Sequence, residues 1–248
     1  VSKKIAEGAG ALVYDVKCGS GAFMKSRETA RSLATRLVAT TRSLGRRARA
    51  LVTDMSQPLG AACGNALEVA ESLETLRGGG PADVRALTLE LAAAMLVESG
   101  ASASLGAARD DAERCLDSGA ALERFMALVE AQGGDARGLE SGRALARAAI
   151  VEVVPAPRSG VVRSVDTFGL GELLVQLGAG RRAKEDAIDP AVGVVVRARI
   201  GDRFSAGAPL AELHQSRPDP DVAGRVAACF ELGDEALAAP ELVLERIG

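Results

Sequence analysis

The stretch GALVYDVK, residues 10–17, decides the fold class, and CGSGAF follows it at residues 18–23. Residues 10–17 form a mainly apolar run with β-branched residues, and glycines lie at both ends, which predicts a buried strand. Apolar residues recur at helical spacing over residues 27–44, and a second strand-like run covers residues 48–54. A strand, a helix and a strand of these lengths predict a βαβ unit with parallel strands and a right-handed crossover.

In the rest of the chain, the predicted secondary structure changes from mainly helical to β-rich near residue 150. A helix is predicted over 64–76, ending at Gly78-Gly79-Gly80-Pro81, and residues 82–131 read as nearly continuous helix with Asp83 as an N-cap. Beyond residue 150, short apolar runs alternate with Gly and Pro, which is typical of a β-rich unit. The individual predictions are helices at 107–117, 119–131 and 219–231, and strands at 150–154, 160–165, 193–200, 209–213 and 241–247. We therefore expect an α/β fold class, a parallel-sheet lobe with a helical segment followed by a β-rich C-terminal unit, with the boundary near 140–150.

Composition excludes several classes of function. The 248 residues have a net charge of −3, which argues against a nucleic-acid binder, because such proteins normally present a basic face. The four cysteines are far apart and form no CxxC pair, so we expect reduced thiols in the cytoplasm rather than zinc or disulfides. No apolar run reaches the roughly 20 residues of a membrane span, so no membrane partner is expected. The chain begins with Val1 rather than Met, and we expect it to be a fragment.

The Gly19-Ser20-Gly21 turn has two interpretations. It lies where the first strand ends and a helix follows, and free N–H groups at such an edge favour anions. Alternatively, the glycines only permit a tight turn between strand and helix. The spacing is neither GxGxxG nor GxxxxGK, so the sequence leaves both interpretations open.

The β-rich tail resembles a biotinyl- or lipoyl-type hammerhead, notably in RIGDRFSAGAPLAELH at residues 199–214. A carrier of that type needs a lysine at a hairpin tip with characteristic flanks. Lys184, in RRAKEDAID, has neither flank. The tail is therefore expected to be structural, barrel-sandwich-like in shape.

Taken together, six stretches resemble the pyrimidine-nucleoside phosphorylase / thymidine phosphorylase family over essentially the whole chain. They are SKKIAEG (2–8), DVKCGSGAFM (15–24), LVTDMSQPLGAACGNALEV (51–69), LRGGGPADVR (76–85), LGAGRRAKEDAIDPAVG (177–193) and GDRFSAGAPLAELH (201–214). The resemblance implies the end of a helical lobe at 1–8, part of an α/β core at 9–145 and a C-terminal β-rich domain at 146–248. It also implies that a glycine-rich phosphate loop lies upstream, so residues 1–248 alone should be inactive.

The function implied by this resemblance is reversible phosphorolysis of pyrimidine nucleosides to free base and pentose 1-phosphate, with thymidine as the first expected substrate and uridine as the second. Inorganic phosphate would be the co-substrate, with no organic cofactor, and the full-length protein would be a cytoplasmic homodimer. Three alternatives stay open: an inactive fragment, a non-catalytic interaction protein of the same fold, and a related AMP phosphorylase-type transferase.

Site residues follow from the resemblance position by position. Lys3 matches a lysine that hydrogen-bonds a pyrimidine carbonyl, whereas without the resemblance two lysines at a chain start are more often solvated surface. The backbone carbonyls of Leu59 and Ala62 and the carboxylate of Glu71 match ligands of a potassium or calcium-like ion, which takes oxygen donors. Glu71 could instead be an exposed carboxylate on a helix.

Other polar residues receive no catalytic assignment. His214, the one histidine, is expected at a strand end without a catalytic role. Asp15, Lys17 and Asp54 should pair with one another or line a cleft, since buried charges are usually paired. Finally, Arg181, Arg182 and Asp186 are expected to organise a loop.

Overall fold

The computed structural model describes residues 1–248, and its first layer is a three-stranded sheet of order β1-β2-β10. Strands β1 (Ala11–Cys18) and β2 (Arg47–Asp54) pair in parallel, with Ala11 opposite Arg47 and Cys18 opposite Asp54. Helix α2 (Arg27–Ser43) connects them and begins at Ser26, whose side chain accepts a hydrogen bond from the Thr29 amide. The predicted parallel β-α-β arrangement is confirmed.

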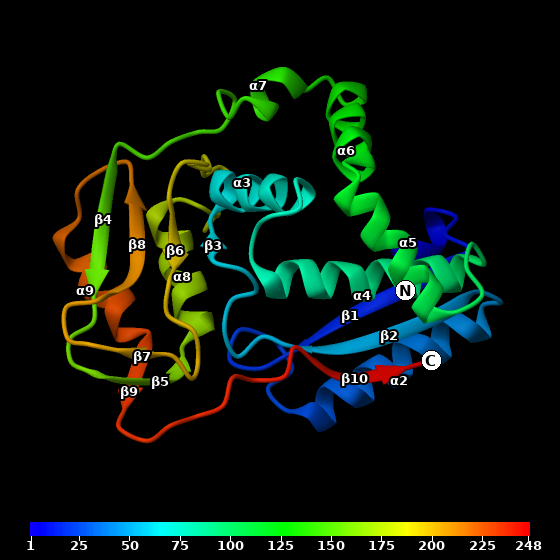
Figure 1. Ribbon diagram of the computed structural model, residues 1–248, viewed down its shortest axis with the longest axis horizontal. Helices are drawn as coiled ribbons and strands as arrows, with labels where there is room; N and C mark the ends of the chain where they lie inside the picture. Colours follow the sequence, from blue (N-terminus) through cyan, green and yellow to red (C-terminus); the bar gives the residue numbers. More distant parts are fainter.

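Helices cover both faces of this sheet (Figure 1). Helix α2 buries Ala30, Ala34 and Val38 against one face, and α4 (Ala82–Ser99) packs on the other. The remaining helices of the first half are α1 (Ser2–Ala6), α3 (Asn65–Leu76), α5 (Leu105–Asp117), α6 (Ala120–Ala131) and α7 (Ala136–Glu140). The predicted helices are present, and the short α7 was not predicted.

The N-cap prediction for α4 is wrong. The cap residue is Pro81, which makes no side-chain hydrogen bond to the helix. Asp83 lies inside the first turn, and its Oδ2 instead accepts a hydrogen bond from the amide of Gly60, 3.1 Å away. The carboxylate of Asp83, which the sequence pattern assigned to the helix cap, therefore binds the loop after β2 instead.

The second half is β-rich, as predicted, and its strands form two separate antiparallel sheets that do not close into a barrel. One has the order β3-β6-β8-β4 and the other β7-β5-β9. The strands are β4 (Ile150–Pro155), β5 (Gly160–Val165), β6 (Gly193–Val196), β7 (Arg203–Phe204), β8 (Pro209–Gln215) and β9 (Phe230–Gly233), with helices α8 (Thr167–Leu177) and α9 (Pro220–Ala228). Helix α8 was missed, and β6 ends four residues before the predicted strand does.

Two short strands link the two halves of the molecule. β3 (Ala62–Cys63), from the first half, pairs with β6 in the four-stranded sheet. β10 (Val243–Ile247), at the end of the chain, pairs antiparallel with β2 (Figure 1). The last strand was predicted correctly, but it lies inside the range 146–248 and nevertheless completes the sheet of the first lobe.

The glycine turn after β1 is a packing junction. Gly19 has φ +136°, and a Cβ there would collide with the backbone of Ser56. The Ser20 hydroxyl lies 3.0 Å from the carbonyl oxygen of Ser56 and 2.9 Å from that of Val165, and its one proton is shared between them. A Cβ on Gly21 would lie 2.6 Å from Cγ2 of Thr167, at the start of α8. These contacts favour the tight-turn interpretation over an anion site, because the turn is filled by protein.

Substituting this turn tests that assignment. Gly19→Ala should lower the free energy of unfolding for two reasons. The added Cβ overpacks the turn, which costs about 1–3 kcal/mol, and a residue with a side chain at positive φ costs roughly 1–2 kcal/mol more. Gly45→Ala is the matched control, because Gly45 has φ +71° and nothing within 4 Å of its added Cβ. Urea denaturation of both variants measures the difference, and equal losses would contradict the packing role.

Candidate active site

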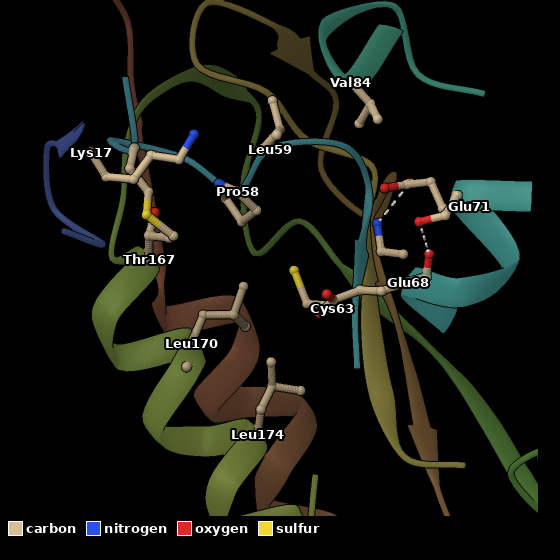
Figure 2. A pocket seen from close by; sticks show the side chains of 14 residues that line it. Lys17, Pro58, Leu59, Cys63, Glu68, Glu71, Val84, Thr167, Leu170 and Leu174 are labelled. Carbon is tan, nitrogen blue, oxygen red and sulfur yellow. Dashed lines mark hydrogen bonds between the residues drawn. The ribbon is translucent and has the colours of Figure 1, made fainter. Parts of the chain in front are cut away.

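A cavity of about 430 Å³ lies beyond the carboxyl ends of β1 and β2, between the loop that follows β2 and helix α8 (Figure 2). We call it the α3–α8 cavity. Ligands of open α/β sheets bind beyond the carboxyl ends of the strands, so its position is the one expected for a site. Its lining residues are Lys17, Met55, Pro58, Leu59, Ala62, Cys63, Glu68, Glu71, Ser72, Val84, Thr167, Leu170, Gly171 and Leu174.

The only cationic side chain in this lining is that of Lys17, near the end of β1. Its Nζ lies 2.7 Å from Oδ2 of Asp15 and donates to the Thr53 hydroxyl at 3.0 Å. Thr53 in turn donates to Oδ1 of Asp15 at 2.5 Å. The predicted pairing of Asp15 with Lys17 is confirmed, whereas Asp54 accepts a separate hydrogen bond from Ser56 at 2.7 Å.

The three residues expected to bind an ion all line the cavity. Glu71, on α3, is half-buried, and its Oε2 accepts hydrogen bonds from the amides of Ala61 at 2.8 Å and Ala62 at 3.0 Å. It is therefore bound to the loop and is not a freely solvated carboxylate. The Leu59 carbonyl accepts no hydrogen bond within the chain.

These donors fit a hard cation such as potassium or calcium, which prefers carbonyl and carboxylate oxygens. No group of three or more His, Cys, Asp or Glu side chains is placed to hold a metal. Glu68 adds a second carboxylate to the lining, although its Oε1 already accepts from the Gly64 amide at 3.0 Å. The cavity thus has an ammonium on the β1 side and carboxylates on the α3 side.

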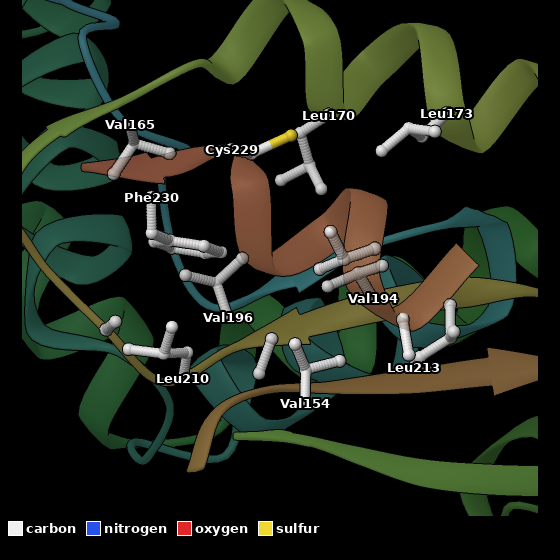
Figure 3. Packing of buried hydrophobic residues seen from close by; sticks show 14 of the residues in the cluster. Val154, Val165, Leu170, Leu173, Val194, Val196, Leu210, Leu213, Cys229 and Phe230 are labelled. Carbon is white, nitrogen blue, oxygen red and sulfur yellow. The ribbon is translucent and has the colours of Figure 1, made fainter. Parts of the chain in front are cut away.

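The opposite wall is helix α8. Thr167 donates to the Ser56 carbonyl at 3.2 Å, which joins the start of this helix to the loop after β2. Leu170 is almost fully buried and belongs to the hydrophobic core of the β-rich unit, where it packs with Cys229 and Phe230 (Figure 3). The helix is therefore fixed in place by the core behind it.

Lys3 does not join this cavity. It is exposed on α1, before the amino end of β1, and is not among the lining residues. The neighbouring Lys4 forms an ion pair with Glu7 at 3.0 Å. Figure 1 shows the N-terminus on the side of the sheet lobe away from the β-rich unit.

His214 and Asp186 also lie away from the cavity. His214, on β8, lines a second, mainly apolar cavity of about 370 Å³, and its Nε2 is buried without a hydrogen-bond partner. Asp186 accepts hydrogen bonds from the amides of Arg182 and Ala183, both at 2.9 Å, and these hold the pKa of its carboxyl below the usual value. The prediction that Asp186 organises its loop is confirmed.

Sequence reasoning missed most of the cavity wall. Lys17 was predicted to pair or to line a cleft and does both, but Cys63, Thr167, Leu170 and Leu174 were not assigned to a site. A usable signal existed for α8, since Asp166 precedes the apolar run and caps the helix by accepting from the Gly169 amide. Gly169 and Gly171 within that run weakened the helical pattern.

Cys63 contributes a protonated thiol to the site. Burial, together with the nearby carboxylates of Glu68 and Glu71, raises the pKa of this thiol to about 12, against a smaller lowering by Arg199. Because the thiolate is the nucleophile in cysteine chemistry, Cys63 is unreactive near neutral pH. It therefore acts as a small apolar wall residue.

Thiol alkylation tests this assignment. With iodoacetamide at pH 8, exposed Cys115 should react first, and Cys63 should stay unmodified because only about one thiol in 10⁴ is ionised at a pKa of about 12. Peptide mass mapping over time measures each site in the folded protein. Urea-unfolded protein is the control, in which both should react. Equal rates of Cys115 and Cys63 in the folded protein would contradict the protonated state of the Cys63 thiol.

Comparison with known proteins accounts for both halves of the chain. The family model "Glycosyl transferase family, a/b domain" matches residues 1–122, and "Pyrimidine nucleoside phosphorylase C-terminal domain" matches residues 161–233. A pyrimidine-nucleoside phosphorylase of Bacillus subtilis (strain 168) is 43% identical over 244 residues, and one of Staphylococcus aureus (strain USA300) is 41% identical over 244 residues.

Each of these alignments covers 98% of this chain and 56% of the relative, so the chain spans little more than half their length. None of the helices in the structure is long and apolar enough to cross a membrane. Over the part of these relatives that it spans, the chain belongs to the pyrimidine-nucleoside phosphorylase family.

Proposed function

We propose that the complete protein catalyses reversible phosphorolysis of pyrimidine nucleosides. A phosphate oxygen attacks C1′ of the sugar, the bond from C1′ to the base nitrogen breaks, and the bonding electrons leave with the pyrimidine. The products are a pentose 1-phosphate and the base, which takes up a proton. Thymidine, deoxyuridine and uridine are the proposed nucleosides.

One observation carries this proposal: the chain matches named pyrimidine-nucleoside phosphorylases over 98% of its length, through both of its structural halves. The α3–α8 cavity adds physical support. The reaction separates charge, with positive charge developing on the sugar and negative charge on the departing base, so it needs fixed charged groups in a site that excludes water. Lys17 and Glu71, on opposite sides of the cavity, are fixed charges of this kind.

We further propose that Leu59, Ala62 and Glu71 hold a potassium or calcium-like ion through two carbonyls and a carboxylate. The unpartnered Leu59 carbonyl and the position of all three residues in one lining support this assignment. When bound, the ion would supply positive charge next to the phosphate co-substrate. No organic cofactor is needed, because phosphate itself is the nucleophile.

Lys3 is proposed to donate a hydrogen bond to a carbonyl of the pyrimidine as the base acquires negative charge. A charged donor gains most when the acceptor becomes an anion, which makes this contact stronger in the transition state. For Lys3 the support is the resemblance alone, because its side chain lies outside the α3–α8 cavity. A homodimeric state and a cytoplasmic location are proposed on the same basis.

A spectrophotometric assay of the complete protein tests the reaction. Thymidine, uridine and deoxyuridine are each incubated with and without inorganic phosphate, and the change in absorbance on release of the base is followed. We expect release that depends on phosphate and is reversed by base plus pentose 1-phosphate. Absence of any phosphate-dependent release would point to a non-catalytic protein. Adenosine monophosphate is tested as a further substrate, and phosphate-dependent release from it but from none of the three nucleosides would point to the related transferase.

A substitution on α1 tests the proposed base contact. Lys3→Ala in the complete protein should lower kcat/KM for thymidine about 10²–10³-fold, the usual loss when one donor to a developing anion is removed. Lys4→Ala is the matched control, because the Lys4 side chain pairs with Glu7 on the protein surface. If Lys3→Ala and Lys4→Ala have the same kinetics, Lys3 does not bind the base.

A further inference from the structure

The loop that leaves β2 is held by an arginine from the other half of the molecule. Arg199, between β6 and β7, donates from Nη1 to the carbonyls of Pro58 at 2.8 Å and Gly60 at 2.6 Å. Its Nη2 forms an ion pair with Asp83, which also accepts from the Gly60 amide. We call this group the Arg199 clamp: Arg199, Asp83 and the backbone of Pro58 and Gly60.

The same loop is fixed from α3. Glu71 accepts the amides of Ala61 and Ala62, and the Val196 amide donates to the Ala61 carbonyl at 2.7 Å. Gly60 fills the space between the two anchors, because a Cβ there would collide with Oε1 of Glu71. Between Arg199 on one side and Glu71 on the other, the loop has little freedom to change its path.

This arrangement selects which carbonyl stays free. The carbonyls of Pro58 and Gly60 are taken by Arg199, and that of Ala61 by β6. The intervening carbonyl, that of Leu59, accepts nothing. Both Nη1 hydrogens of Arg199 are used by the loop carbonyls and Nη2 is paired with Asp83, and Arg199 does not line the cavity, so its effect on the cavity acts through the loop.

We propose that Arg199 is a positioning residue for the cation held by Leu59, Ala62 and Glu71, an inference that rests on the ion site of the proposed function. The guanidinium fork takes two alternate carbonyls and a carboxylate at once, and this leaves the Leu59 carbonyl for the ion. A lysine keeps the charge but cannot reproduce that fork. The β-rich half thereby sets the ion affinity of a site otherwise built by the first half.

The test uses the complete protein with potassium alone as the probe. The thermal midpoint is measured against KCl concentration at constant ionic strength, with tetramethylammonium chloride as the balance, and the rise in Tm reports potassium binding. Arg199→Lys should need at least tenfold more potassium than wild type for the same rise in Tm. Arg197→Lys is the matched control. Arg197 lies two residues before Arg199, and its side chain forms an ion pair with Glu212 on β8 instead of contacting the loop after β2.

Activity gives a second readout. The potassium concentration for half-maximal phosphorolysis should rise by the same factor in Arg199→Lys, while kcat at saturating potassium stays within about threefold of wild type. A purely structural arginine would lower the starting Tm without changing the potassium dependence, so a folded Arg199→Lys protein with wild-type potassium dependence overturns the proposal.

Two further outcomes are informative. If Arg199→Lys does not fold, Asp83→Asn loosens the same clamp without altering Arg199, and a wild-type potassium response in that variant overturns the proposal. A wild-type protein that catalyses phosphorolysis but shows no potassium-dependent shift in Tm overturns both the ion site and the role of Arg199. That result leaves phosphorolysis standing, so the failures of the two proposals are distinguishable.

Discussion

The path of one loop determines how the two halves of this molecule meet. The segment from Gln57 to Ala62 leaves the parallel sheet and enters the antiparallel one, and several of its backbone groups are buried there. Buried amides and carbonyls need partners, because leaving one unpaired costs free energy comparable to a lost hydrogen bond. Arg199, Asp83 and Glu71 supply those partners, and each comes from a different element.

Charged partners are well suited to this task. Hydrogen bonds from a guanidinium or to a carboxylate are roughly twice as strong as neutral ones. The side chains of Arg199 and Asp83 are 27% and 24% exposed, so solvent screens their ion pair only in part. Removing Arg199 would leave the Asp83 charge and two loop carbonyls without a counterpart, which is more damaging than the net contribution of the pair suggests.

Close backbone approach is the second constraint on the junction. Gly19 and Gly21 bring the end of β1 against Met55, Ser56 and Thr167, where side chains larger than hydrogen do not fit. The exchange of β3 and β10 between the halves adds two more connections. Helix α8 and the loop after β2 therefore belong to one packed structure, and the cavity between them is preformed.

The sequence by itself determined the elements whose pattern is local. Periodicity located β1, α2 and β2, as well as α3 and the strands at 150–155 and 160–165, because helical and strand spacing depend on near neighbours. It failed for the two-residue strands β3 and β7, which exist only through their partners, and for α8, whose glycines weaken the helical pattern. Resemblance to a family, and not periodicity, singled out Leu59, Ala62 and Glu71.

Only the tertiary structure decided what surrounds those three residues. It placed Lys17 and Cys63 in the same lining and left Lys3 outside it. It also joined Arg199 to Asp83 across 116 positions of sequence. No local pattern encodes such a pair, because a long-range contact is fixed by how whole elements pack and by which buried groups still require a partner.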